Sequence, residues 1–227
     1  MAERPQSRGK CAYCGAVIAR GGASRHLEAC ARRREAIAQA DSGGGARELL
    51  LHLRVTAEGS SEFWLDLEMR GSASLKTLDT YLRAIWLECC GHLSRFSAGA
   101  SWGSDISMRR KAADVFRPGL TLVHEYDFGS PSYTQIRLAG ERTGVPTTRH
   151  PIALMMRNVM PEAQCGRCDQ PATHLCTRCY EEMDPVYLFC ATHGPKHRHR
   201  DYGGTIPLVN SPRVGICGYE GPADPPY

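Results

Sequence analysis

Residues 47–70 read RELLLHLRVTAEGSSEFWLDLEMR, and this stretch decides the fold. Apolar side chains occupy every second position in residues 49–55 and again in residues 63–69, and Glu58-Gly59-Ser60 separates the two runs. Side chains two positions apart on a strand share one face of a sheet. The stretch therefore predicts an antiparallel hairpin with one buried face.

A helix and further strands are predicted after the hairpin. Apolar side chains next follow helical spacing at Leu75, Leu78, Leu82, Ile85 and Cys89. This predicts a helix of about four turns that ends at Gly91. A second helix is predicted at about 105–116, and strands at about 120–127, 133–139 and 150–157. The order strand, strand, helix, helix and strands predicts an α+β fold, a mainly antiparallel sheet with helices packed on it.

The central segment also contains four short motifs: Leu65-Asp66-Leu67-Glu68, Thr77-Leu78-Asp79, the run IWLECCGHLS from Ile85 to Ser94, and Glu125-Tyr126-Asp127-Phe128-Gly129-Ser130. Together they resemble the Ri-plasmid ORF-three-like family of bacterial proteins, which is linked to passenger genes of insertion elements. Some members carry zinc modules on both sides and end in a segment similar to Asn210–Tyr219. The resemblance covers about 47–150 and supports a central domain, which we place at 47–160, with flanking zinc modules. It implies no reaction, because the family has no settled activity.

The N-terminal residues 1–40 contain a set of candidate zinc ligands: Cys11, Cys14, His26 and Cys30. Their spacing is close to that of a classical zinc finger, with Cys in the last position. Four protein ligands complete a tetrahedron, which is typical of a structural zinc site. The helix of this module is predicted to begin near Ser24 and to run past Cys30 into the basic run 32–34. A flexible Gly-rich linker is predicted at 41–46.

Residues 161–200 contain eight further candidate ligands: Cys165, Cys168, Cys176, Cys179, Cys190, His193, His197 and His199. Eight ligands in pairs suit two tetrahedral sites, which gives three predicted zinc ions for the whole chain. The ladder of pairs resembles a B-box-type zinc module. B-box modules mostly mediate contacts between proteins, so the resemblance implies an interaction role.

Spacing alone leaves the pairing of these eight ligands open. A sequential arrangement groups Cys165, Cys168, Cys176 and Cys179 in one site and Cys190, His193, His197 and His199 in the other. The B-box resemblance implies a crossed arrangement, with Cys165, Cys168, Cys190 and His193 around one ion and Cys176, Cys179, His197 and His199 around the other. Crossing also ties together the two halves of a module whose core is small. We therefore predict the crossed arrangement.

Neither the remaining thiols nor the one serine motif predicts a catalytic site. Cys89 continues the apolar stripe of the predicted helix and is interpreted as a buried thiol, and no role is assigned to Cys90 or Cys217. The GxSxG pattern at 99–103 has Ser/Gly-rich flanks instead of the strand and helix that a nucleophile elbow needs. We predict that the chain is not an enzyme. The Gly/Pro-rich tail at 201–227 is expected to lack regular structure.

Composition and charge limit the function further. The chain has 11 Cys, no apolar stretch after its charged N-terminus and no run of the ~18 apolar residues that a membrane span needs. These features favour a cytoplasmic protein whose thiols bind metal instead of forming disulfides. Residues 1–40 hold eight Lys/Arg against three Asp/Glu, whereas the rest of the chain is almost neutral.

The sequence therefore predicts a zinc-stabilised adaptor with an unknown protein partner. No membrane and no small-molecule substrate are predicted as partners. The alternative is a nucleic-acid-binding factor that uses the basic residues of the N-terminal module: Arg25, Arg32, Arg33 and Arg34. An unrecognised enzyme is the third possibility, and it would need a deep pocket with converging titratable groups.

Overall fold

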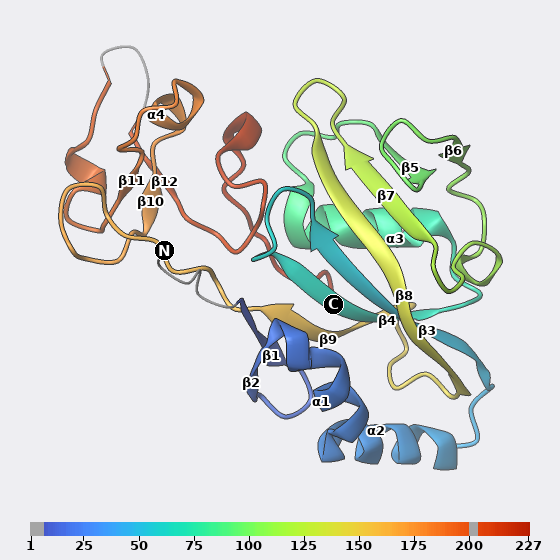
Figure 1. Cartoon of the computed structure of the whole chain (residues 1–227). Coiled ribbons are helices and arrows are strands. Elements are labelled where there is room, and N and C mark those ends of the chain that lie inside the picture. Colours follow the sequence, from blue (N-terminus) through green and yellow to red (C-terminus); the bar gives the residue numbers. More distant parts are fainter. Residues whose placement is uncertain (1–6, 200–203) are drawn as a thin grey trace.

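Figure 1 shows the computed structural model of the chain, which describes residues 7–199 and 204–227. Three features of the sequence lie outside the described residues: Arg4 of the basic stretch at 1–40, Arg200 at the end of the predicted zinc module, and residues 201–203 of the predicted tail. Within the described residues, no helix is both long enough and apolar enough to cross a membrane.

The main sheet contains nine antiparallel strands in the described part of the chain, so the prediction of a mainly antiparallel sheet is confirmed. Their spatial order is β2-β1-β9-β4-β3-β8-β7-β5-β6. The strands are β1 (Arg8–Cys11), β2 (Val17–Ala19), β3 (Glu48–Ala57), β4 (Trp64–Arg70), β5 (Ser94–Ala98), β6 (Asp105–Ile106), β7 (Thr121–Tyr126), β8 (Ser132–Gly144) and β9 (Ile152–Asn158).

The predicted hairpin forms the middle of this sheet. Strand β3 pairs with β4 on one side, with Leu53 opposite Leu67, and with β8 on the other side. The alternation of the sequence sets which face is buried, because Leu51, Leu53 and Val55 are all at most 1% exposed.

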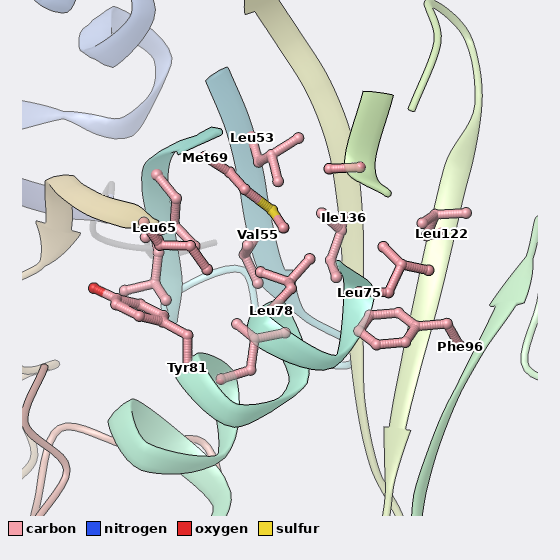
Figure 2. Close-up of a cluster of buried hydrophobic side chains, with 14 of the residues drawn as sticks. Leu53, Val55, Leu65, Met69, Leu75, Leu78, Tyr81, Phe96, Leu122 and Ile136 are labelled. Carbon is pink, nitrogen blue, oxygen red and sulfur yellow. The ribbon is translucent and has the colours of Figure 1, made fainter. Parts of the chain in front are cut away.

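Helix α3 (Leu75–Leu82) contributes side chains to the same core as the sheet. Figure 2 shows Leu75 and Leu78 of this helix beside Val55 and Ile136 of the strands. The Ser74 hydroxyl accepts a hydrogen bond from the Thr77 amide at 3.3 Å, which satisfies one free donor at the start of the helix. The helical segment continues through the π turn η2 (Arg83–Leu87) and ends before the predicted stop at Gly91.

The predicted second helix at 105–116 is wrong, and with it the predicted element order. This segment forms the short strand β6 and, further on, the 3-10 turn η3 (Ala112–Asp114). Its backbone carbonyls are used elsewhere: Met108 accepts from the Lys76 amide at 2.8 Å and Arg110 from the Leu75 amide at 2.9 Å. These carbonyls satisfy free donors in the first turn of α3, and this contact favours the irregular path of the segment over a helix of its own.

The N-terminal metal-ligand module extends the main sheet. Strand β1 pairs with β9, which places Cys11 opposite Met156. The predicted continuous helix is broken at Cys30, where ψ of 113° separates α1 (Ala23–Ala29) from α2 (Ala31–Ser42). The start of the predicted linker at 41–46 is therefore helical, because α2 continues to Ser42.

The C-terminal module has a small sheet of its own, in the order β11-β10-β12. Its elements are β10 (His174–Leu175), α4 (Thr177–Glu181), β11 (Leu188–Phe189), the 3-10 turn η4 (Gly194–Lys196) and β12 (Ile206–Pro207). Strand β12 belongs to the tail that was expected to lack regular structure, so this expectation is wrong at Ile206–Pro207, although most of the described tail is irregular. The tail continues into the 3-10 turn η5 (Ile216–Gly218) and returns toward the central sheet (Figure 1).

Candidate metal centres

The structure brings together the four candidate ligands of the N-terminal module: Cys11, Cys14, His26 and Cys30. Cys11 ends β1, Cys14 follows in the tight turn before β2, and His26 lies on α1. Cys14 Sγ lies 3.4 Å from His26 Nε2. Burial raises the pKa of the Cys11 thiol to about 11, so a bound cation is needed to favour its thiolate at neutral pH.

The apolar residues behind this cluster come from the main sheet. Leu27 of α1 is 1% exposed and shares a buried cluster with Trp64 of β4 and Met155 and Met156 of β9. The Trp64 side chain packs so closely on β1 that a Cβ at Gly9 would lie 2.5 Å from it. The ligand set is thus held by packing against the sheet as well as by its own spacing.

The second cluster joins Cys165, Cys168, Cys190 and His193. His193 Nδ1 lies 3.4 Å from Cys165 Sγ, 3.5 Å from Cys168 Sγ and 3.4 Å from Cys190 Sγ. A tetrahedral zinc ion with Zn–S bonds of ~2.3 Å and Zn–N bonds of ~2.1 Å separates sulfur and nitrogen by about 3.6 Å. The four atoms therefore have almost the separations of a metal-ligand set.

Electrostatics in this second cluster favour a thiolate. Burial opposes ionisation of Cys165, but hydrogen bonds from backbone amides, including that of Arg167 at 3.4 Å, and from His193 lower the pKa of Cys165 to about 6. Soft cations such as zinc are bound by thiolates, so this cluster has the chemistry of a metal site.

The third cluster joins Cys176, Cys179, His197 and His199. Cys179 Sγ lies 3.4 Å from His197 Nε2 and 3.3 Å from His199 Nε2. The His197 ring stacks on Phe189 with 4.3 Å between ring centres, which fixes its orientation. The eight ligands of the module are thus grouped in the crossed order, with the pairs at 165–168 and 176–179 in different clusters.

A fourth cluster unites residues to which the sequence assigned no ligand role: Cys89, Cys90, His92 and Cys217. The interpretation of Cys89 as a buried core thiol is incomplete, because its side chain is partly exposed and its sulfur belongs to this cluster. All 11 cysteines of the chain fall within the four clusters. A count of the thiols left over after the zinc spacings would have pointed to this set, since three Cys and the nearby His92 make up one more complete group.

The four candidate nucleic-acid contacts do not form one exposed face. Arg25, Arg32 and Arg34 are exposed on α1 and α2, whereas the Arg33 side chain is 14% exposed. Arg33 Nη2 donates to Glu68 Oε2 of β4 at 3.3 Å. Arg33 therefore links α2 to β4 of the main sheet and is not free to contact phosphates.

The GxSxG stretch lies in a turn between two antiparallel strands. It follows β5 and precedes β6, and the Ser101 carbonyl accepts a hydrogen bond from Arg95 at 2.9 Å. Asp127 and His150 follow Ser101 in the chain order of a hydrolase triad, but neither is free for that role. Asp127 is engaged by Arg213 at 2.6 Å, and His150 stacks on Tyr227 at 4.1 Å between ring centres.

Comparison with known proteins assigns neither a family nor a function. No family model and no curated protein matches the chain. A crystal structure of a protein of unknown function from Methanosarcina mazei Go1 is similar to 46% of this chain and 66% of its own, with 18% sequence identity and a TM-score of 0.39.

Proposed function

We propose that the chain is a zinc-stabilised adaptor that binds another protein through an open groove beside the start of β5, near the β6 end of the main sheet. Three structural zinc ions, in the clusters of Cys11, Cys165 and Cys176, hold the two terminal modules in shape. Each of these clusters supplies four protein ligands, which leaves no coordination position for a substrate or a reactive water. The metal in this proposal has a structural role only.

The observation that carries the proposal is the groove itself. It has a volume of about 430 Å³ and is lined by Leu93, Ser94, Arg95, Asp105, Glu125 and Phe128. Leu93 is 72% exposed and Phe128 is 52% exposed, and both line this groove. Large apolar side chains that are exposed next to one another mark a candidate binding surface. Exposed apolar residues with charged residues between them are typical of a surface that recognises a protein.

The strand beside the groove is partly open for pairing. The short strand β6 pairs with β5 only at Phe96 and Ser97. The start of β5, at Ser94 and Arg95, extends beyond that pairing. An extended segment of a partner can add to such an edge through main-chain hydrogen bonds, while its side chains contact Leu93 and Phe128.

The test is affinity capture with the zinc-loaded full chain, with and without nuclease treatment of the extract. We expect a protein to be retained after nuclease treatment, to be lost with Phe128→Ser and to be lost with Leu93→Ser. Trp102→Ser is the matched control, because Trp102 is 87% exposed but does not line the groove. Equal retention by all three variants, or retention that nuclease abolishes, would contradict the adaptor function.

Nucleic-acid binding is the second candidate, and the exposure of three arginines favours it. Arg25, Arg32 and Arg34 are exposed on the N-terminal helices, where they are able to contact phosphates. Three such contacts give a log–log salt dependence with a slope of roughly −3. Replacing these three arginines with Ala should flatten the slope, whereas affinity for DNA and RNA that does not depend on salt would exclude this candidate.

A further inference from the structure

The fourth Cys/His cluster has the geometry of a metal site. Cys90 Sγ lies 3.5 Å from Cys89 Sγ and 3.6 Å from Cys217 Sγ, and Cys217 Sγ lies 3.5 Å from His92 Nε2. Tetrahedral zinc bonds separate two sulfurs by about 3.8 Å and a sulfur from a nitrogen by about 3.6 Å. We propose that Cys89, Cys90, His92 and Cys217 bind a fourth zinc ion.

One separation in this cluster is shorter than a tetrahedral edge. Cys90 Sγ lies 2.8 Å from His92 Nε2, which is a hydrogen-bond distance. An entering cation replaces the proton between these two atoms and moves them roughly 0.8 Å further apart, to the separation that zinc bonds require. Cys90 and His92 lie in the irregular segment between η2 and β5, so this movement leaves the strands in place.

The local chain is built to bring three ligands together within four residues. Helical structure ends at Leu87, and the Glu88 carboxylate accepts hydrogen bonds from the Gly91 amide at 2.6 Å and from the Tyr126 hydroxyl at 3.0 Å. Gly91 has φ of +75°, a conformation that favours glycine. The hydrogen bond between Glu88 and Gly91 closes a turn. In this turn the ligand atoms of Cys89, Cys90 and His92 lie close together.

The fourth ligand arrives from the other end of the sequence. Cys217 lies 127 residues from Cys90 and has φ of +52°, an uncommon conformation for a residue with a side chain. Gly215 and Gly218 on either side also have positive φ, at +86° and +67°. Such a tight turn persists only where surrounding contacts impose it. The turn presents the Cys217 thiol to the other three ligands.

Buried polar contacts hold this returning segment in place. Arg213 is 0% exposed and donates hydrogen bonds to Asp127 at 2.6 Å and to the Ser132 hydroxyl at 2.9 Å. The Ser211 hydroxyl donates to the Trp86 carbonyl at 2.6 Å, beside the end of the helical segment. The position of Cys217 is therefore fixed by the core of the central domain.

Arg213 also supports the charge of the proposed site. Its Nη2 lies 3.4 Å from Cys89 Sγ. Zinc with three thiolates and one imidazole carries a net negative charge, and an N–H donor on a coordinating sulfur stabilises that charge. The donor set of three Cys and one His also matches the clusters of Cys11 and Cys165.

A disulfide and a reactive thiol are the competing interpretations. A disulfide between Cys90 and Cys217 needs an S–S separation of about 2.05 Å and leaves Cys89 and His92 without a role. A reactive Cys90 paired with His92 leaves the other two sulfurs unexplained, although both lie within 3.6 Å of the Cys90 sulfur. A metal ion uses all four donors.

The proposed ion ties the end of the helical segment to the C-terminal tail. The module that contains Cys165 and Cys176 lies between β9 and this tail in the sequence, so both of its connections become anchored to the central domain. This role concerns the architecture of the chain and is independent of the adaptor function.

Metal analysis of the full-length chain, expressed with zinc and purified under reducing conditions, tests the site. We expect four zinc ions per chain in the wild type and three in Cys217→Ser and in Cys90→Ser. Leu93→Ser is the matched control beside the cluster and should keep four, because Leu93 supplies no ligand. A wild-type chain with three ions overturns the proposal.

Thiol labelling of the wild type provides a test that needs no variant. Cys90 and Cys217 are exposed, so an alkylating reagent should modify them rapidly unless a metal ion holds them. We expect both to be protected in the zinc-loaded chain and to become reactive together after a chelator is added. Rapid labelling in the presence of saturating zinc overturns the site, and so does an intact mass that shows a disulfide between them.

Discussion

The two metal-ligand modules at the ends of the chain use similar ligands in different surroundings. The N-terminal cluster rests on a buried group that includes Leu27, Trp64, Met155 and Met156, most of it supplied by the main sheet. The C-terminal module has a much smaller apolar group, made of Cys176, Cys179 and Phe189 with Val186 and Tyr187 packed on it. In the proposed zinc-loaded chain, we therefore expect metal to contribute most of the folding free energy of the second module and only part of that of the first.

This difference shows that ligand spacing identifies a metal-ligand set but does not indicate how much apolar packing stabilises the module around it. Both modules begin with a Cys-x2-Cys turn, and both read as small independent units in the sequence. In the structure, β1 of the first module joins the nine-stranded sheet through β9. The second module forms its own three-stranded sheet.

The largest expected effect is the selective unfolding of the C-terminal module when metal is removed. Structural zinc contributes about 10–16 kcal/mol of apparent binding free energy in small modules, far more than this small core can replace. With a strong chelator, we expect amides in residues 165–199 to lose all protection from hydrogen exchange. Amides of β1 should keep measurable protection, because their pairing with β9 remains.

Single ligand substitutions sharpen the same contrast. Cys176→Ser should unfold the C-terminal module, whereas Cys14→Ser should weaken metal binding with less loss of structure, since Cys14 is exposed at the edge of its cluster. Simultaneous loss of protection in β1 and in the C-terminal module would show that the two modules depend on metal equally.

The next largest effect concerns the attachment of the N-terminal module to the sheet. A Cβ at Gly9 would lie 2.5 Å from the Trp64 ring and 2.9 Å from the Arg157 carbonyl. Gly9→Ala therefore overpacks the contact between β1 and β9, and we expect it to destabilise the chain by about 3 kcal/mol. Denaturant unfolding, monitored by tryptophan fluorescence, measures this loss.

Gly140→Ala is the matched control for this substitution. Gly140 lies on β8 of the same sheet, and the nearest atom to a Cβ there is 4.0 Å away. We expect this variant to stay within about 1 kcal/mol of the wild type. If both glycine variants unfold alike, the close packing of Trp64 on β1 is not what attaches the module.

Patterns that depend on neighbouring residues could be predicted from the sequence. The alternation in residues 49–55 and 63–69 predicted the central hairpin, because an apolar residue at every second position lies on the same, buried face of a strand. The Cys-x2-Cys pairs gave three of the four clusters, because a tight turn places two sulfurs together regardless of the rest of the fold. The crossed grouping depended on resemblance to a known module, since spacing alone allowed another arrangement.

Features that depend on distant residues could not be predicted in this way. The stretch 105–116 has a helical pattern, but its carbonyls at Met108 and Arg110 bond to the start of α3. The fourth cluster needs the tail to return to the core, and the residue that achieves this is Arg213, a charged side chain that is 0% exposed. A buried Arg is recognisable only once its partner, Asp127, is known.

The central sheet and the metal-ligand modules should lose stability at different acidic pH values. Burial opposes ionisation of Asp79, but hydrogen bonds from His124, Lys76 and Ser94 outweigh it and hold its pKa well below the usual range. A carboxyl whose pKa is lowered by folding contributes stability above its unfolded pKa of ~3.9, and this stability is lost as the pH falls through the folded value. The sheet should therefore survive acidification to about pH 4, whereas we expect the proposed zinc sites to lose metal at higher pH, because protons compete with the ion for its ligands.

Asp79→Asn tests this acid limit directly. The substitution removes the charge and weakens the hydrogen bonds of a fully buried group, which we expect to cost about 2 kcal/mol at neutral pH. Below pH 4 the difference from the wild type should shrink, because Asp79 then takes up a proton in the unfolded wild-type chain while it stays ionised in the folded one. Circular dichroism during acid titration of both proteins measures it, and a constant difference down to pH 2 would show that ionised Asp79 does not set the limit.

The smallest expected effect separates two neighbouring arginines of the N-terminal module. Arg33 is 14% exposed and pairs with Glu68, whereas Arg32 is 71% exposed and pairs with Glu35 one turn away on the same helix. Arg33→Ala leaves Glu68 with Arg142 as its remaining partner, at 2.7 Å, so the loss should be limited to about 1 kcal/mol. Arg32→Ala should change stability by less than about 0.5 kcal/mol, because exposed ion pairs are screened by water and salt.

Nucleic-acid binding should show the opposite order for the same pair of variants. An exposed cation is available to phosphates, so Arg32→Ala should weaken any such binding and reduce its salt dependence, while Arg33→Ala should leave both almost unchanged. Thermal unfolding and a salt titration of DNA and RNA binding, carried out on both variants, measure the two properties independently. If Arg33→Ala weakens nucleic-acid binding without loss of stability, Arg33 leaves Glu68 in solution, and the attachment of α2 to the sheet is weaker than its contacts indicate.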